Sequence, residues 1–239
     1  MLMQDGIKHN RKKIQRLMQI ANLKAVCPGK KTSIRNKEHK VYPYLLKNVD
    51  IVRPNQAWQV DLTYIKIRGG YVYLTCLIDI YSRKIMGWNM SPFLDAAACI
   101  KALENALRNA LPEIINSDQG SQFTSIDWCQ MLSENRITIS MDGKGRWADN
   151  AYIERLWRTI KYELVYLHCF ETVNQLWRAI SQYIDFYNTV RPHQALGYRC
   201  PNQVYKEFEY VRNRLEKIEI QGPFLGSSKD SQIFTNFWS

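Results

Sequence analysis

The sequence predicts an α/β fold in which a mixed five-stranded sheet is flanked by helices. Three successive segments rich in β-branched and aromatic residues, 57–67, 71–80 and 83–90, predict an antiparallel meander whose first turn contains Gly69 and Gly70. Two shorter apolar runs then alternate with helical patterns, which is typical of strands joined through crossover helices. With 239 residues and 46% hydrophobic content, the chain can bury one substantial core with small appendages.

The elements after the meander also follow from local patterns. Segment 94–110 has apolar residues at helical spacing, and the apolar run 113–117 predicts a strand. A second helix is predicted at about 125–134, a strand at 136–140, and a third helix from Ala151 onward. In a mixed sheet of this order, the ends of the first and fourth strands lie close together.

The charge of the chain indicates a polyanionic partner. Lysine and arginine outnumber aspartate and glutamate by 33 to 22, which gives a net charge of +11 and an isoelectric point near 9.4. Nucleic acid is favoured over an anionic membrane because no long basic amphipathic segment is set apart, and no apolar run is long enough to cross a bilayer. The alternative is that the charge serves solubility alone.

Composition divides the chain into five parts. Residues 1–23 contain a short basic amphipathic helix, and residues 24–56 form a basic linker interrupted by proline and glycine. The core is expected at 57–168, a helical extension at 169–210 and a tail at 211–239. Two interpretations of the linker stay open, an extended segment that follows nucleic-acid phosphates and a disordered tether.

The helical extension begins with an amphipathic pattern at 172–188, which we expect to pack against the core. Its apolar face consists of Leu176, Ile180, Tyr183, Ile184 and Tyr187.

Three acidic residues stand out by their positions. Asp61 lies in the middle of a predicted strand, between Val60 and Leu62, where a carboxylate is disfavoured. Asp118 follows a short strand, and Glu154 lies one turn into a helix after a gap of 35 residues. Mg²⁺ and Mn²⁺ take oxygen ligands and bind through a few carboxylates together with substrate phosphate. The three acids therefore predict a metal site.

At these residues the chain resembles the catalytic protein of insertion-sequence transposases related to retroviral integrase, the insertion-sequence-three-like family, whose enzyme is encoded in two overlapping frames. The resemblance runs from about Arg11 to Tyr205 and depends on several motifs in a fixed order. The motifs are RPNQAWQVDLTYI, LIDIYSRKIMGW, INSDQGSQF, ADNAYIERLWRTIKYE and YNTVRPHQALG.

The resemblance implies a ribonuclease-H-like core and a DDE-type polynucleotidyl transferase. Asp61, Asp118 and Glu154 match the acids of the family signature and would hold two Mg²⁺ or Mn²⁺ ions, with Asp61 bridging both. The implied reactions are phosphodiester cleavage at transposon ends and strand transfer, which are the steps of DNA integration and recombination. Two alternatives stay open: a catalytically retired DNA-binding remnant, and a metal-dependent nuclease with the same fold.

The DNA-binding candidates are basic residues close to Glu154 in the sequence. Arg158 and Lys161 follow Glu154 by four and seven residues, so all three share one helix face. The alternative for Arg158 is an ordinary surface ion pair with Glu154. The complete candidate set is Lys144, Arg146, Arg155, Arg158 and Lys161.

The resemblance also implies partners. Segment 11–23 resembles the last helix of the family's N-terminal helix-turn-helix, so residues 1–23 are interpreted as a partial remnant of it. We expect a homo-oligomer on DNA and an upstream-frame protein that supplies the helix-turn-helix. The location expected is the bacterial cytoplasm, associated with the nucleoid, and six dispersed cysteines without a CxxC pair fit a reduced, cytosolic protein.

Four further motif residues have two possible roles each. Asp79 is expected to serve a turn or to support the site from behind, and Trp157 is expected to pack the core rather than stack on bases. Arg191 and His193 could either fix a loop or contact DNA.

Overall fold

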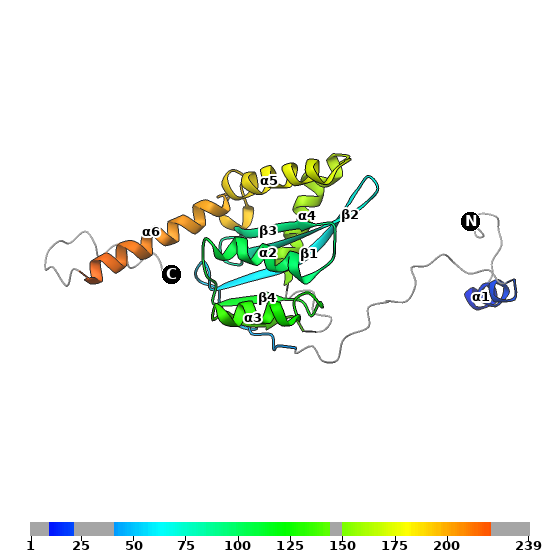
Figure 1. Ribbon diagram of the computed structural model, residues 1–239, viewed down its shortest axis with the longest axis horizontal. Helices are drawn as coiled ribbons and strands as arrows, with labels where there is room; N and C mark the ends of the chain where they lie inside the picture. Colours follow the sequence, from blue (N-terminus) through cyan, green and yellow to red (C-terminus); the bar gives the residue numbers. More distant parts are fainter. Residues whose placement is uncertain (1–9, 22–40, 144–149, 221–239) are drawn as a thin grey trace. The chain divides into compact units, whose positions relative to one another are not determined.

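The computed structural model describes residues 10–21, 41–143 and 150–220, and the chain forms two compact units, residues 1–36 and 37–239. In the first unit, helix α1 (Arg11–Ile20) begins at Asn10, whose side-chain oxygen accepts a hydrogen bond from the Lys12 backbone N–H at 3.0 Å. The second unit contains the sheet and all other described elements (Figure 1).

The sheet has five strands in the order β3-β2-β1-β4-β5, which confirms the predicted mixed α/β architecture. Strands β1 to β3 form the predicted antiparallel meander, whereas β4 and β5 run parallel to β1. The strands are β1 (Ala57–Ile67), β2 (Gly70–Asp79), β3 (Ile85–Ser91), β4 (Ile114–Ser117) and β5 (Thr138–Met141).

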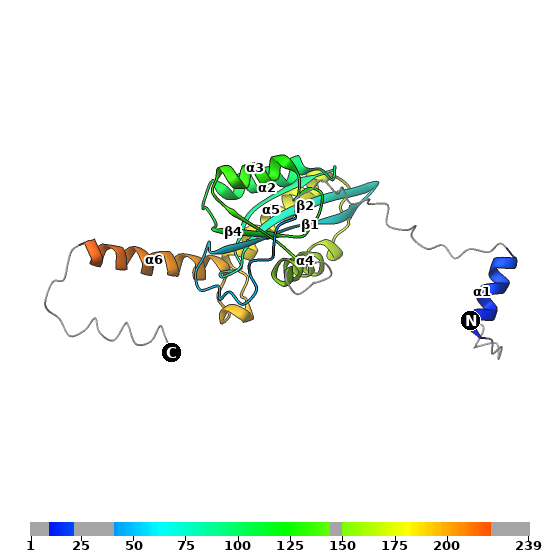
Figure 2. The same cartoon turned by 90° about the horizontal axis from the view of Figure 1, so that it is seen from below.

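Helices cover both faces of the sheet, with α2 and α3 on one face and α4 and α5 on the other (Figures 1 and 2). The helices of this unit are α2 (Ala96–Leu107), α3 (Ile126–Glu134), α4 (Ala151–Glu163), α5 (Val173–Thr189) and α6 (Pro201–Ile220). Two short 3₁₀ helices, Val165–Leu167 and Gln194–Leu196, follow α4 and α5. Within the described ranges, no helix combines the length and the apolar character needed to cross a membrane.

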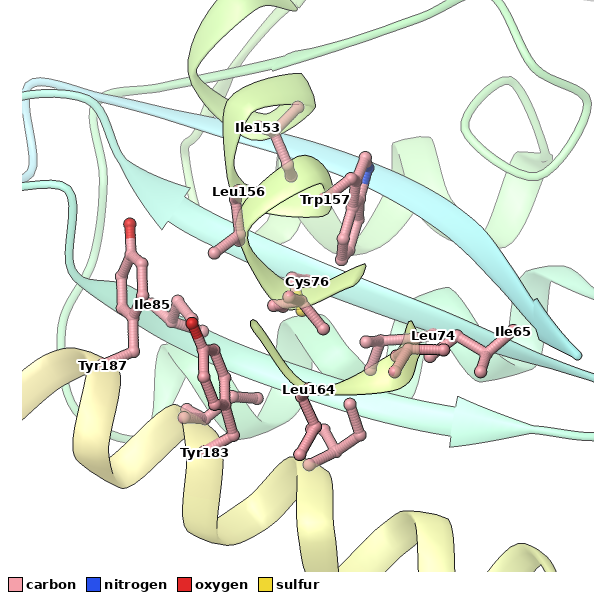
Figure 3. Close-up of a cluster of buried hydrophobic side chains, with 14 of the residues drawn as sticks. Ile65, Leu74, Cys76, Ile85, Ile153, Leu156, Trp157, Leu164, Tyr183 and Tyr187 are labelled. Atoms are coloured by element: carbon pink, nitrogen blue, oxygen red, sulfur yellow. The ribbon is translucent and has the colours of Figure 1, made fainter. Parts of the chain in front are cut away.

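Helix α5 packs with its predicted apolar face against the core. All five residues of that face are buried, and they share one hydrophobic cluster with strand residues such as Leu74 and with α4 residues such as Leu156. Figure 3 shows Leu156 and Trp157 of α4 and Tyr183 and Tyr187 of α5 in this cluster. The helical extension is therefore an integral layer of the core.

The structure describes two segments that adjoin the expected domain boundaries. Within the expected linker, residues 43–45 pack beside β5: the Leu45 N–H donates to Ser140 Oγ at 3.0 Å and the Met141 N–H donates to the Pro43 carbonyl at 3.3 Å. The predicted tail from residue 211 begins inside α6, which continues to Ile220. Composition does not predict contacts between segments distant in the sequence, and it does not predict how far a helix continues.

A glycine determines how closely α2 approaches the sheet. A Cβ atom on Gly87 of β3 would lie 2.6 Å from the Ala102 carbonyl oxygen and 2.6 Å from the Cβ atom of Ala106, and both alanines are fully buried. We expect Gly87→Ala to lower the free energy of unfolding by about 1–3 kcal/mol, because the strand and helix must separate. Urea denaturation measures the change.

Gly70→Ala is the matched control, because a Cβ atom there meets nothing within 4 Å. Equal losses of stability in the two variants would contradict the close approach of β3 and α2 as the cause.

Candidate active site

The parallel register of β1 and β4 brings two of the three predicted acids side by side. Gln59 is paired with Asn116, and continuing this register by two residues places Asp61 opposite Asp118. Asp118 directly follows β4, at the carboxyl end of that strand. Asp61 is half-buried and lies opposite Cys76 of β2 on its other side. The sheet therefore supplies two carboxylates at one edge of the β1–β4 pair.

Helix α4 brings the third acid to the same strand. The Ile153 N–H donates to Gln59 Oε1 at 3.1 Å, and Trp157 Nε1 donates to Asp61 Oδ2 at 2.8 Å. Glu154 lies between these two attachment points, in the first turn of α4, and is exposed. Its position along β1 is thus fixed from both sides by hydrogen bonds.

The charges of the three acids interact. The pKa of Asp61 is raised to about 6; burial is the largest cause, and the nearby charges of Asp118 and Glu154 contribute to the rise. The hydrogen bond from Trp157 opposes these effects and lowers the pKa of Asp61. A cation at this position would relieve the repulsion between the carboxylates.

Asp118 is held by the loop that follows it. Its Oδ1 accepts a hydrogen bond from the Gly120 N–H at 2.9 Å, which lowers its pKa, whereas the protein atoms around the carboxyl group raise it and are the larger effect. This desolvation occurs although the residue as a whole is exposed. A Cβ atom on Gly120 would lie 2.4 Å from Gln122 Nε2 and 2.8 Å from Asp118 Oδ1, so a larger residue there would displace the ends of these two side chains.

A fourth acid, Asp142, lies next to Asp118 in the register of β4 and β5, which pairs Ser117 with Met141. Asn116 Nδ2 donates to Asp142 Oδ1 at 2.6 Å, and Gln119 Nε2 donates to the Asp142 carbonyl at 2.9 Å. Asp142 therefore helps to hold the loop that carries Asp118, which is a structural role.

The donor chemistry of the three acids fits a divalent cation, but their present geometry is not a ligand cage. Across residues 10–21, 41–143 and 150–220, no three Asp, Glu, His or Cys side chains lie close enough together to hold a metal ion. All three candidates offer carboxylate oxygens, which Mg²⁺ and Mn²⁺ prefer, and their mutual repulsion favours a bound cation. The fold brings the acids to one region without closing them around an ion.

Trp157 has a role that the sequence did not reveal. It packs in the core cluster, as expected, and it also donates its indole N–H to Asp61. The available signal was general: a buried tryptophan usually needs an acceptor for its N–H. Nothing local to the sequence identifies an acceptor 96 residues away.

The basic candidates that the structure describes lie on α4. Arg155 and Arg158 are exposed, and Lys161 is half-buried with its Nζ 5.4 Å from the centre of the Tyr64 ring. Among the described ion pairs, none joins Glu154 to Arg158, so the surface ion pair considered for these residues is not formed. The other two candidates, Lys144 and Arg146, lie outside the described residues.

Two further motif residues have structural roles. Asp79 is buried and accepts hydrogen bonds from the Ser82 and Asn55 backbone N–H groups at 2.7 and 2.8 Å, which confirms the turn role. Arg191 donates through Nε and Nη2 to both carboxylate oxygens of Glu163, so it fixes the segment after α5.

Comparison with known proteins first defines the class. Two family models of the integrase core domain match this chain, one over residues 52–146 and the other over residues 135–201. The structure of the HTLV-2 integrase catalytic core domain in complex with magnesium, in its trimeric form, superimposes with a TM-score of 0.55 at 21% identity, covering 64% of this chain and 98% of that one. The fold is thus the ribonuclease-H-like core of retroviral integrases.

The family follows from closer relatives. The transposase for insertion sequence element IS904 of Lactococcus lactis is 34% identical, over 85% of this chain and 82% of that protein. The transposase for insertion sequence element IS629 of Shigella sonnei is 29% identical, over 87% and 71% respectively. The chain belongs to the insertion-sequence transposases related to retroviral integrase. It is therefore a polynucleotidyl transferase that acts in DNA transposition.

The raised pKa of Asp61 makes stability depend on pH. The folded protein favours the protonated form of Asp61, so the protonated carboxyl group contributes its full stabilisation below the ordinary pKa of 3.8. That stabilisation is lost as the pH rises through about 6. Without metal ions, we expect Asp61→Asn to match the parent near pH 4 and to exceed its stability at pH 8 by about 1–3 kcal/mol. Urea denaturation across this pH range provides the measurement.

Two variants sharpen this test. Asp185→Asn removes an exposed acid from α5 and should give no comparable gain at pH 8. Trp157→Phe removes the donor to Asp61 Oδ2, so the carboxyl resonance of Asp61 should titrate at higher pH by NMR. An Asp61→Asn protein no more stable than the parent at pH 8 would show that this carboxylate is well solvated.

Proposed function

We propose that Asp61, Asp118 and Glu154 are the catalytic acids of a DDE-type transposase, and that they hold two Mg²⁺ or Mn²⁺ ions. The reactions proposed are phosphodiester cleavage at transposon ends and joining of those ends to target DNA. The observation that supports the proposal is the attachment of α4 to β1 on either side of Glu154, together with the pairing of β1 with β4, the strand that precedes Asp118.

The proposed roles follow from charge and position. When bound, the divalent ions would polarise the reacting phosphate and favour ionisation of the attacking water or hydroxyl group. Asp61 interacts electrostatically with both other acids, so it would contact both ions, whereas Asp118 and Glu154 would each complete one site. Trp157 holds one oxygen of Asp61 and so limits rotation of its carboxylate.

The reaction itself needs no covalent link between protein and DNA. Water attacks phosphorus at the transposon end, the phosphodiester bond breaks, and a 3′-hydroxyl is released. That hydroxyl then attacks a target phosphodiester and displaces its 3′ oxygen. The protein aligns the two DNA strands and neutralises charge in the transition state.

DNA binding is assigned to the basic residues near Glu154. Arg155, Arg158 and Lys161 on α4 would contact backbone phosphates, and Lys144 and Arg146 remain candidates from the sequence alone. We further propose that the chain acts as a homo-oligomer on DNA and that an upstream-frame protein supplies a helix-turn-helix. Its place of action would be the nucleoid in the bacterial cytoplasm.

The acids are tested by conservative amide variants. We expect Asp61→Asn, Asp118→Asn and Glu154→Gln each to abolish cleavage and joining of a transposon-end fragment with Mg²⁺ or Mn²⁺, because each loses a negative ligand. DNA binding should change little, since the phosphate contacts come from other residues. Gel assays of cleaved and joined products, run beside binding assays, measure both.

Asp185→Asn is again the control and should retain full activity. Joining within tenfold of the parent in any of the three variants would remove that residue from the catalytic set. Cleavage by the parent without joining would indicate a nuclease, and binding without either reaction would indicate a retired DNA-binding protein.

The basic residues are tested by the salt dependence of binding. Arg158→Ala and Lys161→Ala should each weaken DNA binding and reduce the slope of log affinity against log salt by about 0.9, one phosphate contact's share. Fluorescence anisotropy with a duplex at several salt concentrations measures the slope. Arg178→Ala, which removes an exposed arginine from α5, should leave it unchanged. Unchanged slopes with reduced thermal stability would make Arg158 and Lys161 structural residues.

A further inference from the structure

Four exposed tyrosines and two cations lie on the β1–β2 hairpin, on α4, which carries Glu154, and on the 3₁₀ helix after α4. The rings of Tyr64, Tyr71, Tyr162 and Tyr166 are large and apolar, yet these residues are 61%, 53%, 63% and 65% exposed. We call this surface the tyrosine patch. It consists of Tyr64, Tyr71, Tyr162, Tyr166, Arg158 and Lys161.

Ring contacts connect the patch across two elements. Tyr64 and Tyr71, on neighbouring strands of the β1–β2 hairpin, meet edge to face with ring centres 5.7 Å apart. Lys161 of α4 lies over Tyr64, which joins the hairpin to the helix. The ring centres of Tyr162, on α4, and Tyr166, in the 3₁₀ helix Val165–Leu167 that follows it, are 5.3 Å apart.

The hairpin that carries half of the patch is anchored. It extends past the neighbouring strands (Figure 1), and the Arg68 N–H beside its turn donates to the Phe170 carbonyl at 3.0 Å. The Arg68 guanidinium also pairs with Glu171 at 3.0 Å. These contacts tie the hairpin to the connection between α4 and α5, so the two halves of the patch keep a fixed relation.

We propose that the tyrosine patch binds unpaired bases of the DNA strand that enters the active site; this inference rests on the proposed function. Exposed aromatic rings offer stacking surfaces that accept any base, and cations beside them attract the backbone. Arg158 and Lys161 follow Glu154 on α4, so a strand leaving the acids along this helix reaches the patch next. The acid beside Arg158 and Tyr162 is Glu163, and its carboxylate is paired with the Arg191 guanidinium.

A second copy of the chain fits this surface less well. In a symmetric dimer the same patch would face itself, so Arg158 and Lys161 would meet their own counterparts and lose hydration without gaining an opposite charge. A polyanion supplies that charge, and the net charge of +11 favours such a partner.

The test compares DNA probes that differ only in base pairing at one end. Affinities are measured by fluorescence anisotropy, with EDTA present, for a blunt duplex and for the same duplex whose last bases are mismatched. We expect the parent to prefer the unpaired end. A Tyr64→Ala/Tyr162→Ala protein should lose about 5- to 100-fold in affinity for the unpaired end and less than about threefold for the blunt duplex.

Two matched variants serve as controls. Tyr64→Phe/Tyr162→Phe keeps both aromatic faces and should retain the preference for the unpaired end. Tyr210→Ala removes a tyrosine that is 67% exposed on α6, outside the patch, and should also retain it. Thermal denaturation of each variant checks that the fold is kept.

Three outcomes would overturn the inference. One is a parent that binds both probes equally, and another is an alanine variant that loses affinity equally for both. The third is a change of oligomeric state by sedimentation with unchanged DNA affinities, which would make the patch a contact between copies. Binding is measured without metal, so this test can be interpreted even if the three acids are not catalytic. Likewise, the cleavage and joining assays can be interpreted even if the tyrosine patch does not bind unpaired bases.

Discussion

The candidate site depends on the attachment of α4 to β1. Two hydrogen bonds, from the Ile153 N–H to Gln59 and from Trp157 to Asp61, fix the first turns of the helix along the strand. Glu154 lies between them, so the relation between strand and helix acids is set by this contact. The bond to Asp61 also offsets part of the cost of burying a carboxylate in a strand.

The apolar layer beneath α4 explains why residues far from the acids matter to them. Ile153, Leu156 and Ile160 are buried against the sheet, and α5 packs on the same face of the sheet and shares this cluster. Since side chains in a close-packed interior shift little, this layer determines the height and rotation of α4. A change in α5 would therefore reach Glu154 through packing, although α5 carries none of the candidate acids.

The sequence predicted those features that have a local signal. Segments rich in β-branched and aromatic residues predicted the meander, the 3.6-residue period predicted the buried face of α5, and Asp61 was conspicuous because a strand interior disfavours it. The bond from Trp157 to Asp61 and the packing of residues 43–45 beside β5 could not be predicted in this way. Such contacts join segments about 95 residues apart, and only the folded chain brings them together.

The charged residues of α4 lie in a more favourable electrostatic environment than Asp61 of β1. In α4, Glu154 lies in the first turn and Lys161 in the last turn, where acidic and basic charges respectively are favoured by the helix dipole. Asp61 lies on a strand and has no helix dipole to stabilise its charge. Its raised pKa reflects both burial and its acidic neighbours. Burial is the larger of these two causes, so ionisation of Asp61 opposes the packing of β1. A bound cation would offset that cost, and the stability of β1 should therefore respond to metal occupancy.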